Sequence, residues 1–79
     1  MNNKKKGKVR IGRIYSYEYD PGHIVRVDYI SEPDDDGDQI IQFTILQEGK
    51  EMDGDDINTL EFFEMYFNLV PVLRAKLYE

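Results

Sequence analysis

The chain contains no cysteine among its 79 residues. It can therefore form neither a disulfide framework nor a thiolate zinc site, and this absence suits a reducing cytosol. A small domain of this kind depends on packing of aliphatic and aromatic side chains, and six tyrosines and four phenylalanines are present for it. We expect residues 1–8 to form a disordered basic tail and residues 9–79 to form one small domain.

Long apolar runs are also missing from the sequence. No run approaches the roughly 20 residues that a helix needs to cross a membrane. Residues 1–8 are basic, but the apolar stretch of a secretion signal does not follow them. We therefore expect a cytoplasmic protein that has no membrane partner.

Sequence motifs of catalysis are not found either. The single histidine, His23, follows Asp20-Pro21-Gly22, where we expect a type II turn and a solvated side chain rather than a general base. The serines and threonines lack a nucleophile motif, and there is no glycine-rich phosphate loop. The sequence predicts a protein that is not an enzyme and needs no cofactor.

The stretch "EPDDDGDQ", residues 32–39, raises the question of a calcium site. An EF-hand loop has glycine at position six and a bidentate glutamate at position twelve. Alignment of Gly37 with position six places Phe43 at position twelve, and alignment of Gly54 places Leu60 there. Because both loops lack the glutamate, we expect no specific metal site.

Charge is distributed very unevenly along the chain. Six basic side chains and no acid precede Ile14, whereas sixteen acids and four basic side chains follow, a formal charge of −12. Ten of these acids lie between Glu32 and Asp56, with only Lys50 opposing them. This excess is greater than solubility requires, and it destabilises a compact state through repulsion.

Alternation of apolar and polar residues predicts three strands. The residues expected to face inward are Val9, Ile11, Tyr15, Tyr17 and Tyr19 in the first strand, Val25, Val27 and Tyr29 in the second, and Ile41, Phe43 and Ile45 in the third. We expect a bulge near Gly12 and a hairpin turn at Asp36-Gly37. A short fourth strand around Glu51 and Met52, or only a loop, would follow.

The C-terminal part has the pattern of a helix. Asn58 would be its N-cap, with Glu61 completing a capping box, and Leu60, Phe63 and Phe67 would pack on the sheet. Pro71 would end or kink this helix, and residues 72–79 would form a last helix or an edge strand. We predict an α+β fold, in which a bent antiparallel sheet of three to four strands carries a C-terminal helical segment. A mainly β small barrel is the alternative.

Two interpretations of the charges compete. Runs of acids usually face water, and the basic segment could touch phosphates. However, the acidic body repels a polyanion over a Debye length of about 8 Å, so we expect no direct binding of nucleic acid. Acids two apart on a strand are about 6.5 to 7 Å apart, close to the spacing of successive phosphates. Such a row can imitate DNA.

A small, cysteine-free and strongly acidic chain with a β-rich core resembles the DNA-mimic inhibitors encoded by phages. The resemblance implies a non-catalytic inhibitor in the host cytosol that occupies the nucleic-acid-binding surface of a basic host protein. The first expected target is a histone-like nucleoid protein of the HU kind. The expected partner-binding residues are Glu18, Asp20, Glu32, Asp34, Asp35, Asp36, Asp38, Glu48, Glu51, Asp53, Asp55 and Asp56.

A rival hypothesis is a small homodimeric structural or adaptor module. It would act through an aromatic C-terminal face made of Phe62, Tyr66, Phe67 and Tyr78, and the acids would only confer solubility. The segments "GRIYSYEY", "HIVRVDYI", "IIQFTIL" and "LEFFEMYF" resemble the strands and closing helical turn of small SH3-like barrels. This resemblance implies an SH3-like half-barrel rather than any particular activity.

Overall fold

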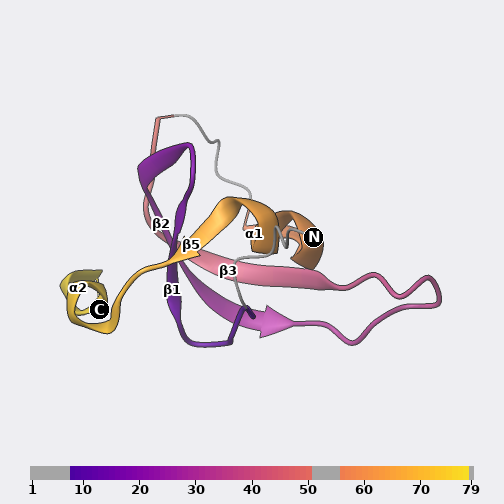
Figure 1. Ribbon diagram of the computed structural model, residues 1–79. Helices are drawn as coiled ribbons and strands as arrows, with labels where there is room; N and C mark the ends of the chain where they lie inside the picture. The colour runs from indigo at the N-terminus through magenta and orange to yellow at the C-terminus, as the bar shows by residue number, and fades with distance from the viewer. Residues whose placement is uncertain (1–7, 51–55, 79) are drawn as a thin grey trace, which may run out of the picture.

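A computed structural model describes residues 8–50 and 56–78 as one open antiparallel sheet with short helical segments. Its elements in chain order are β1 (Ile14–Tyr17), β2 (Asp20–Ile30), β3 (Ile40–Gln47), β4 (Ile57–Thr59), α1 (Leu60–Tyr66), β5 (Phe67–Leu69), α2 (Val72–Ala75) and a 3₁₀ turn, Lys76–Tyr78. The strand order is β4-β3-β2-β1-β5, so the last strand returns beside the first, and α1 links the two edge strands (Figure 1). The small, sheet-dominated antiparallel fold is as predicted, but it has five strands rather than three to four.

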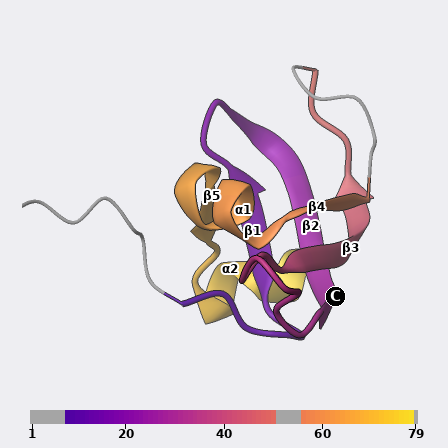
Figure 2. The same ribbon diagram turned by 90° about the vertical axis from the view of Figure 1, so that its right-hand side faces the viewer.

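The sheet is covered on both faces near β1 and β2. The larger core lies between the sheet and α1 and contains Val9, Tyr15, Val25, Val27, Ile41, Phe43, Phe63 and Phe67. A smaller core on the other face, next to α2, contains Ile14, Ile24, Val70 and Ala75. Figure 1 shows α1 and α2 on different sides of β1 and β2, and Figure 2 shows the molecule from the side of α1. Double coverage explains why neighbours such as Ile14 and Tyr15 are both buried, which breaks the expected alternation.

The first strand is shorter than predicted. It begins at Ile14, because a turn at Ile11 and Gly12 precedes it and Gly12 has a φ of +89°. Outside the strand, Ile11 is 58% exposed, and Tyr19 is 62% exposed in the turn after β1. Neither residue faces inward as the alternation predicted, because Ile11 precedes the strand and Tyr19 follows it.

The prediction of a turn at Asp20–His23 is wrong. The chain reverses at Glu18 and Tyr19, and Asp20 already belongs to β2. The register shifts so that Tyr17 pairs with Asp20 and Ser16 pairs with Ile24, which leaves Pro21 without a ladder partner on β1. Proline is tolerated in a strand at such a bulge, where no backbone donor is required.

The third strand and the hairpin turn are as predicted. Ile41 and Phe43 are buried, Ile45 is partly buried, and the Gln42 and Thr44 side chains between them are exposed. Gly37 has a φ of +84°, as the turn requires. In β2, however, a register shift between Val27 and Tyr29 leaves Tyr29 47% exposed rather than inward.

The C-terminal helix is shorter than predicted and has a different cap. Thr59 is the N-cap, and its hydroxyl accepts a hydrogen bond from the Phe62 N–H, whereas Asn58 pairs with Ile41 in β4. The helix ends at Tyr66, and Phe67–Leu69 forms β5 against β1. Phe63 packs on the sheet as expected. Pro71 caps a helical turn at Val72–Ala75, so the edge-strand alternative for this segment is wrong.

The fourth strand predicted around Glu51 and Met52 lies outside the described residues, as does most of the predicted tail. Within the part of the chain that is described, no helix has the length and apolar character needed to cross a membrane.

Candidate functional site

Four of the predicted partner-binding residues meet at the tip of the β2–β3 hairpin, which projects from the rest of the molecule (Figure 1). Asp34, Asp35, Asp36 and Asp38 are all exposed, and Glu32 is exposed just before them. None of these four aspartates pairs with a basic side chain among the described residues. The Arg26–Asp28 ion pair, 3.2 Å long, lies further along β2. The tip therefore presents uncompensated negative charge to the solvent.

A network of hydrogen bonds holds the shape of this tip. One carboxylate oxygen of Asp34 accepts bonds from the N–H groups of Asp36 and Asp38, both 2.9 Å long. The Asp34 N–H donates to the Asp38 carbonyl, and the Gly37 N–H donates to the Asp34 carbonyl. Below the turn, the Ser31 hydroxyl accepts from the Ile40 N–H. We call Asp34–Asp38 the aspartate turn, and its geometry depends on the Asp34 carboxylate.

A hollow of about 420 Å³ lies beside the aspartate turn. The residues that line it include Gly37 and Asp38 of the turn and Glu61 and Glu64 of α1. The Leu60 N–H donates to the Gln39 carbonyl, 2.9 Å away, and this bond ties the start of α1 to the hairpin. The aspartate turn together with Glu61 and Glu64 forms what we call the acidic surface. Neither glutamate is among the predicted partner-binding residues, although their spacing of three places them on one side of a helix.

The other predicted acids are not part of this surface. Glu18 lies in the β1–β2 turn, Asp20 begins β2 and Glu48 follows β3. Asp20 and Glu48 both act electrostatically on His23, so they belong to a separate region. Figure 1 shows the β1–β2 turn well away from the hairpin tip. Asp56 is exposed next to β4, and Glu51, Asp53 and Asp55 lie outside the described residues.

The aspartate turn is a compact cluster and not a row along a strand. The closest carboxylate oxygens of Asp34, Asp36 and Asp38 lie within 4.8 Å of one another. Alternate residues of a strand would be about 6.5 to 7 Å apart. Among the described residues, these three form the group that could share a metal ion. Exposed carboxylates are common without one, and two N–H groups already occupy one Asp34 oxygen.

His23 is buried, in contrast to the prediction of a solvated turn residue. It is 0% exposed, on the same side of β2 as Val25 and Val27. Its ring lies against the rings of Tyr17 and Phe67, with centroids 6.4 Å away in both cases. Burial lowers the pKa of His23, and the nearby Asp20 and Glu48 carboxylates partly oppose this by raising it. Extending the Val25 and Val27 alternation by two residues would have placed His23 inside.

The four residues of the predicted aromatic face do not form one exposed surface. Phe67 is 2% exposed and belongs to the main core. Phe62 and Tyr66 are partly buried and pack on each other, with ring centroids 4.8 Å apart. Tyr78 packs against the smaller core on the other face. The most exposed apolar side chains near the C-terminus are instead Leu73 and Leu77, at 82% and 78%.

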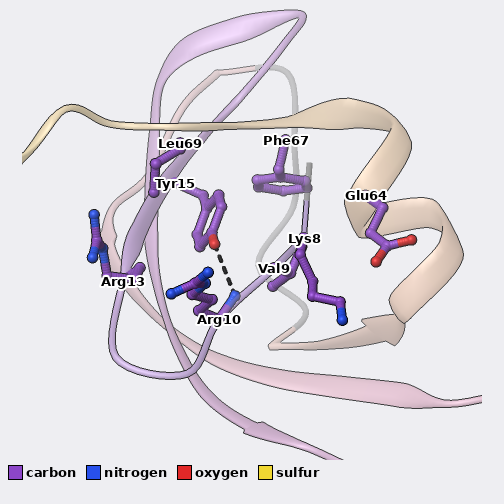
Figure 3. A pocket seen from close by; sticks show the side chains of 8 residues that line it. All are labelled: Lys8, Val9, Arg10, Arg13, Tyr15, Glu64, Phe67 and Leu69. Carbon is purple, nitrogen blue, oxygen red and sulfur yellow. Dashed lines mark hydrogen bonds between the residues drawn. The ribbon is translucent and has the colours of Figure 1, made fainter. Parts of the chain in front are cut away.

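A second hollow, of about 280 Å³, has the opposite charge (Figure 3). Its basic lining residues are Lys8, Arg10 and Arg13, and its apolar ones are Val9, Phe67 and Leu69. The Tyr15 ring enters from β1, and its hydroxyl oxygen accepts a hydrogen bond from the Arg10 N–H, 2.9 Å long. Glu64 stands on the side of Lys8, away from Arg13 (Figure 3). We call this hollow the basic pocket.

Comparison of the chain with protein-family models, with curated proteins and with solved structures gave no significant match.

Proposed function

We propose that the protein is a non-catalytic inhibitor that binds a basic, nucleic-acid-binding protein through its acidic surface. The observation that carries this proposal is the aspartate turn. Its backbone is held by hydrogen bonds to the Asp34 carboxylate, and the exposed side chains of Asp35, Asp36 and Asp38 project from it beside the hollow that Glu61 and Glu64 help to line. A turn whose backbone is already fixed costs less ordering entropy when a partner binds. As a compact cluster, rather than a row with the spacing of successive phosphates, its carboxylates can bind lysine and arginine side chains of the partner that otherwise contact phosphates.

The charge balance of the chain supports a basic partner. Long-range attraction between a strongly acidic surface and a basic one accelerates encounter and is weakened by salt. A lysine or arginine side chain of the partner could enter the hollow between Asp38 and Glu61. A histone-like nucleoid protein of the HU kind is the first target that we propose. The predicted SH3-like half-barrel stays a prediction, and the return of β5 to β1 supports it.

Binding to a purified HU-type protein tests the proposal. The dissociation constant would be measured by calorimetry at low and moderate salt, with duplex DNA as competitor. In the test variant, Asp35, Asp36 and Asp38 become asparagine, and Asp34 is kept because its carboxylate holds the turn. We expect affinity to fall by about tenfold or more, because charge-assisted bonds to the partner are lost.

A matched control removes three charges elsewhere, with Glu18→Gln, Glu48→Gln and Asp56→Asn. These changes weaken long-range steering but leave the acidic surface intact, so a smaller loss is expected. Equal losses in the two triple variants would mean that net charge, and not this surface, attracts the partner. Failure of duplex DNA to displace the protein would also contradict mimicry.

The exposure of Leu73 and Leu77 favours a second candidate, a homodimeric or adaptor module. Large apolar side chains exposed together commonly mark contact surfaces. The contact surface of such a module would be the C-terminal helical segment that carries Leu73 and Leu77, rather than the predicted aromatic face. Sedimentation velocity of the parent and of a Leu73→Ser, Leu77→Ser variant tests it. A parent that stays monomeric at high concentration would exclude a homodimer.

A further inference from the structure

The basic pocket plays no part in the proposed function, and we infer that it binds an oxyanion, a carboxylate or a phosphate monoester, carried on a small apolar body. The inference depends on the way the backbone places Arg10 and Arg13, on the hydroxyl of Tyr15, and on the apolar residues around them. It does not rest on the proposed function, although Glu64 lines both hollows.

A fixed turn carries the two arginines. The Arg13 N–H donates to the Arg10 carbonyl across a turn, and the positive φ of Gly12 allows it. The turn is attached to β2 at two points, because the Gly12 N–H donates to the Val27 carbonyl (2.7 Å) and the Val27 N–H donates to the Arg13 carbonyl (3.1 Å). The backbone below both guanidinium groups is therefore anchored to the core of the sheet.

Tyr15 adds a neutral donor to this arrangement. Its ring is 4% exposed and packs edge-on against Phe63, with centroids 5.3 Å apart. The hydroxyl oxygen accepts a hydrogen bond from the backbone N–H of Arg10. No acceptor for the hydroxyl hydrogen is found among the described residues. This hydrogen can be donated to a ligand. Two guanidinium groups and one phenolic O–H suit the planar or tetrahedral oxygens of an oxyanion.

Apolar residues make the rest of the wall. Val9 and Phe67 are nearly buried at 8% and 2%, and Leu69 is 49% exposed at the edge (Figure 3). Small-molecule sites usually combine an apolar lining with a few polar groups, and the lining of this pocket contains both kinds of residue. An aromatic or branched aliphatic body could lie against Leu69 and Phe67 while its oxyanion meets Arg10 and Arg13.

The surrounding charge limits the size of the ligand. Glu64 lines both the basic pocket and the hollow beside the aspartate turn, so an acidic side chain stands at one edge of the basic pocket. A long polyanion would extend past Glu64 over the acidic surface and be repelled, whereas a small anion could stay near Arg13, on the side of the pocket away from Glu64 (Figure 3). The pocket should thus select small anions over nucleic acid.

Titration of the full-length, ¹⁵N-labelled chain with phenyl phosphate and with benzoate tests the inference. Benzylamine and benzyl alcohol serve as cationic and neutral probes of similar shape. We expect saturable shifts of the amide signals of Arg10, Gly12, Arg13 and Leu69 with the anions and much weaker effects with the other two probes. The tighter anion identifies phosphate or carboxylate as the preferred group.

Arg13→Gln is the main variant, because the backbone of Arg13, and not its side chain, holds the turn. We expect about a tenfold loss of affinity, the effect of one charge-assisted hydrogen-bond pair. Arg26→Gln is the control, since Arg26 pairs with Ile14 and therefore lies on the face of the sheet opposite Tyr15. A thermal melt of each variant confirms folding. Unchanged affinity in Arg13→Gln, or benzyl alcohol binding as tightly as the anions, would overturn the inference.

Discussion

The backbone N–H of Gly49 donates a hydrogen bond of 3.1 Å to Nδ1 of His23. Because Nδ1 is the acceptor, the neutral ring carries its hydrogen on Nε2, which is buried and has no partner among the described residues. A second proton on Nδ1 would place two donors against each other and a positive charge inside the core. The bond therefore ties the chain after β3 to the core only while His23 is neutral.

Stability should consequently depend on pH in the range from the ordinary histidine pKa of about 6.5 downward. The pKa of His23 is lowered in the folded protein by burial, so the unfolded chain binds more protons in this range. Stability is fully present above the unfolded pKa and is lost as pH falls toward the folded pKa. We expect the melting temperature to decrease on acidification, as followed by circular dichroism.

His23→Phe supplies the control for this pH effect. Phenylalanine keeps a ring beside Tyr17 and Phe67 but cannot titrate. The variant should melt at nearly the same temperature at pH 5.5 and pH 7.5. If the variant keeps the slope of the parent, His23 is not its source.

Gly49 should not tolerate a side chain. A Cβ at this position would collide with the Asp20 carboxylate and lie 2.8 Å from the Cβ of His23, which cannot move independently of β2. We expect Gly49→Ala to reduce the free energy of unfolding by about 1 to 3 kcal/mol. Gly22→Ala is the matched change, because its nearest neighbour would be an Asp20 oxygen at 3.4 Å. Urea denaturation of both variants would show the difference, and equal costs would contradict the packing argument.

Phe63 is the central side chain of the main core. It is fully buried and stacks on Phe67, with centroids 4.1 Å apart and planes 2° apart. Phe63→Ala should cost about 3 to 5 kcal/mol, enough to unfold a domain of this size. Its neighbour Phe62 is only partly buried, so Phe62→Ala should cost about 1 to 2 kcal/mol and leave a cooperative melt. Similar melts for the two variants would refute this placement of the core.

The N-terminal boundary of the domain can be tested by truncation. Removing residues 1–7 leaves every contact described above in place. Removing residues 1–9 also deletes Val9, which is 8% exposed in the main core. Loss of that burial should cost about 1.5 to 3 kcal/mol and lower the melting temperature by roughly 10 °C. If the two truncated chains melt alike, Val9 does not belong to the core.

Several features follow from local sequence alone. The aspartate turn follows from Asp36-Gly37, because only glycine adopts a positive φ there at low cost. The alternation of Ile41, Phe43 and Ile45 determines which side of β3 faces the core, since the side chains of a strand alternate. The acidic excess is also evident in the sequence, as are the four aspartates at one tip.

Tertiary structure determined the last strand, the burial of His23 and the position of the two glutamates of α1. The run after Met65 suits a helix or a strand locally, and it becomes a strand at Phe67 because the edge of β1 offers backbone partners to β5. The alternation of Val25 and Val27 points His23 inward, but the rings of Tyr17 and Phe67 that cover it come from two other segments of the chain. Glu61 and Glu64 lie beside the aspartate turn because the hydrogen bond from the Leu60 N–H to the Gln39 carbonyl holds the start of α1 against the hairpin. Long-range backbone pairing thus determined which charges became neighbours.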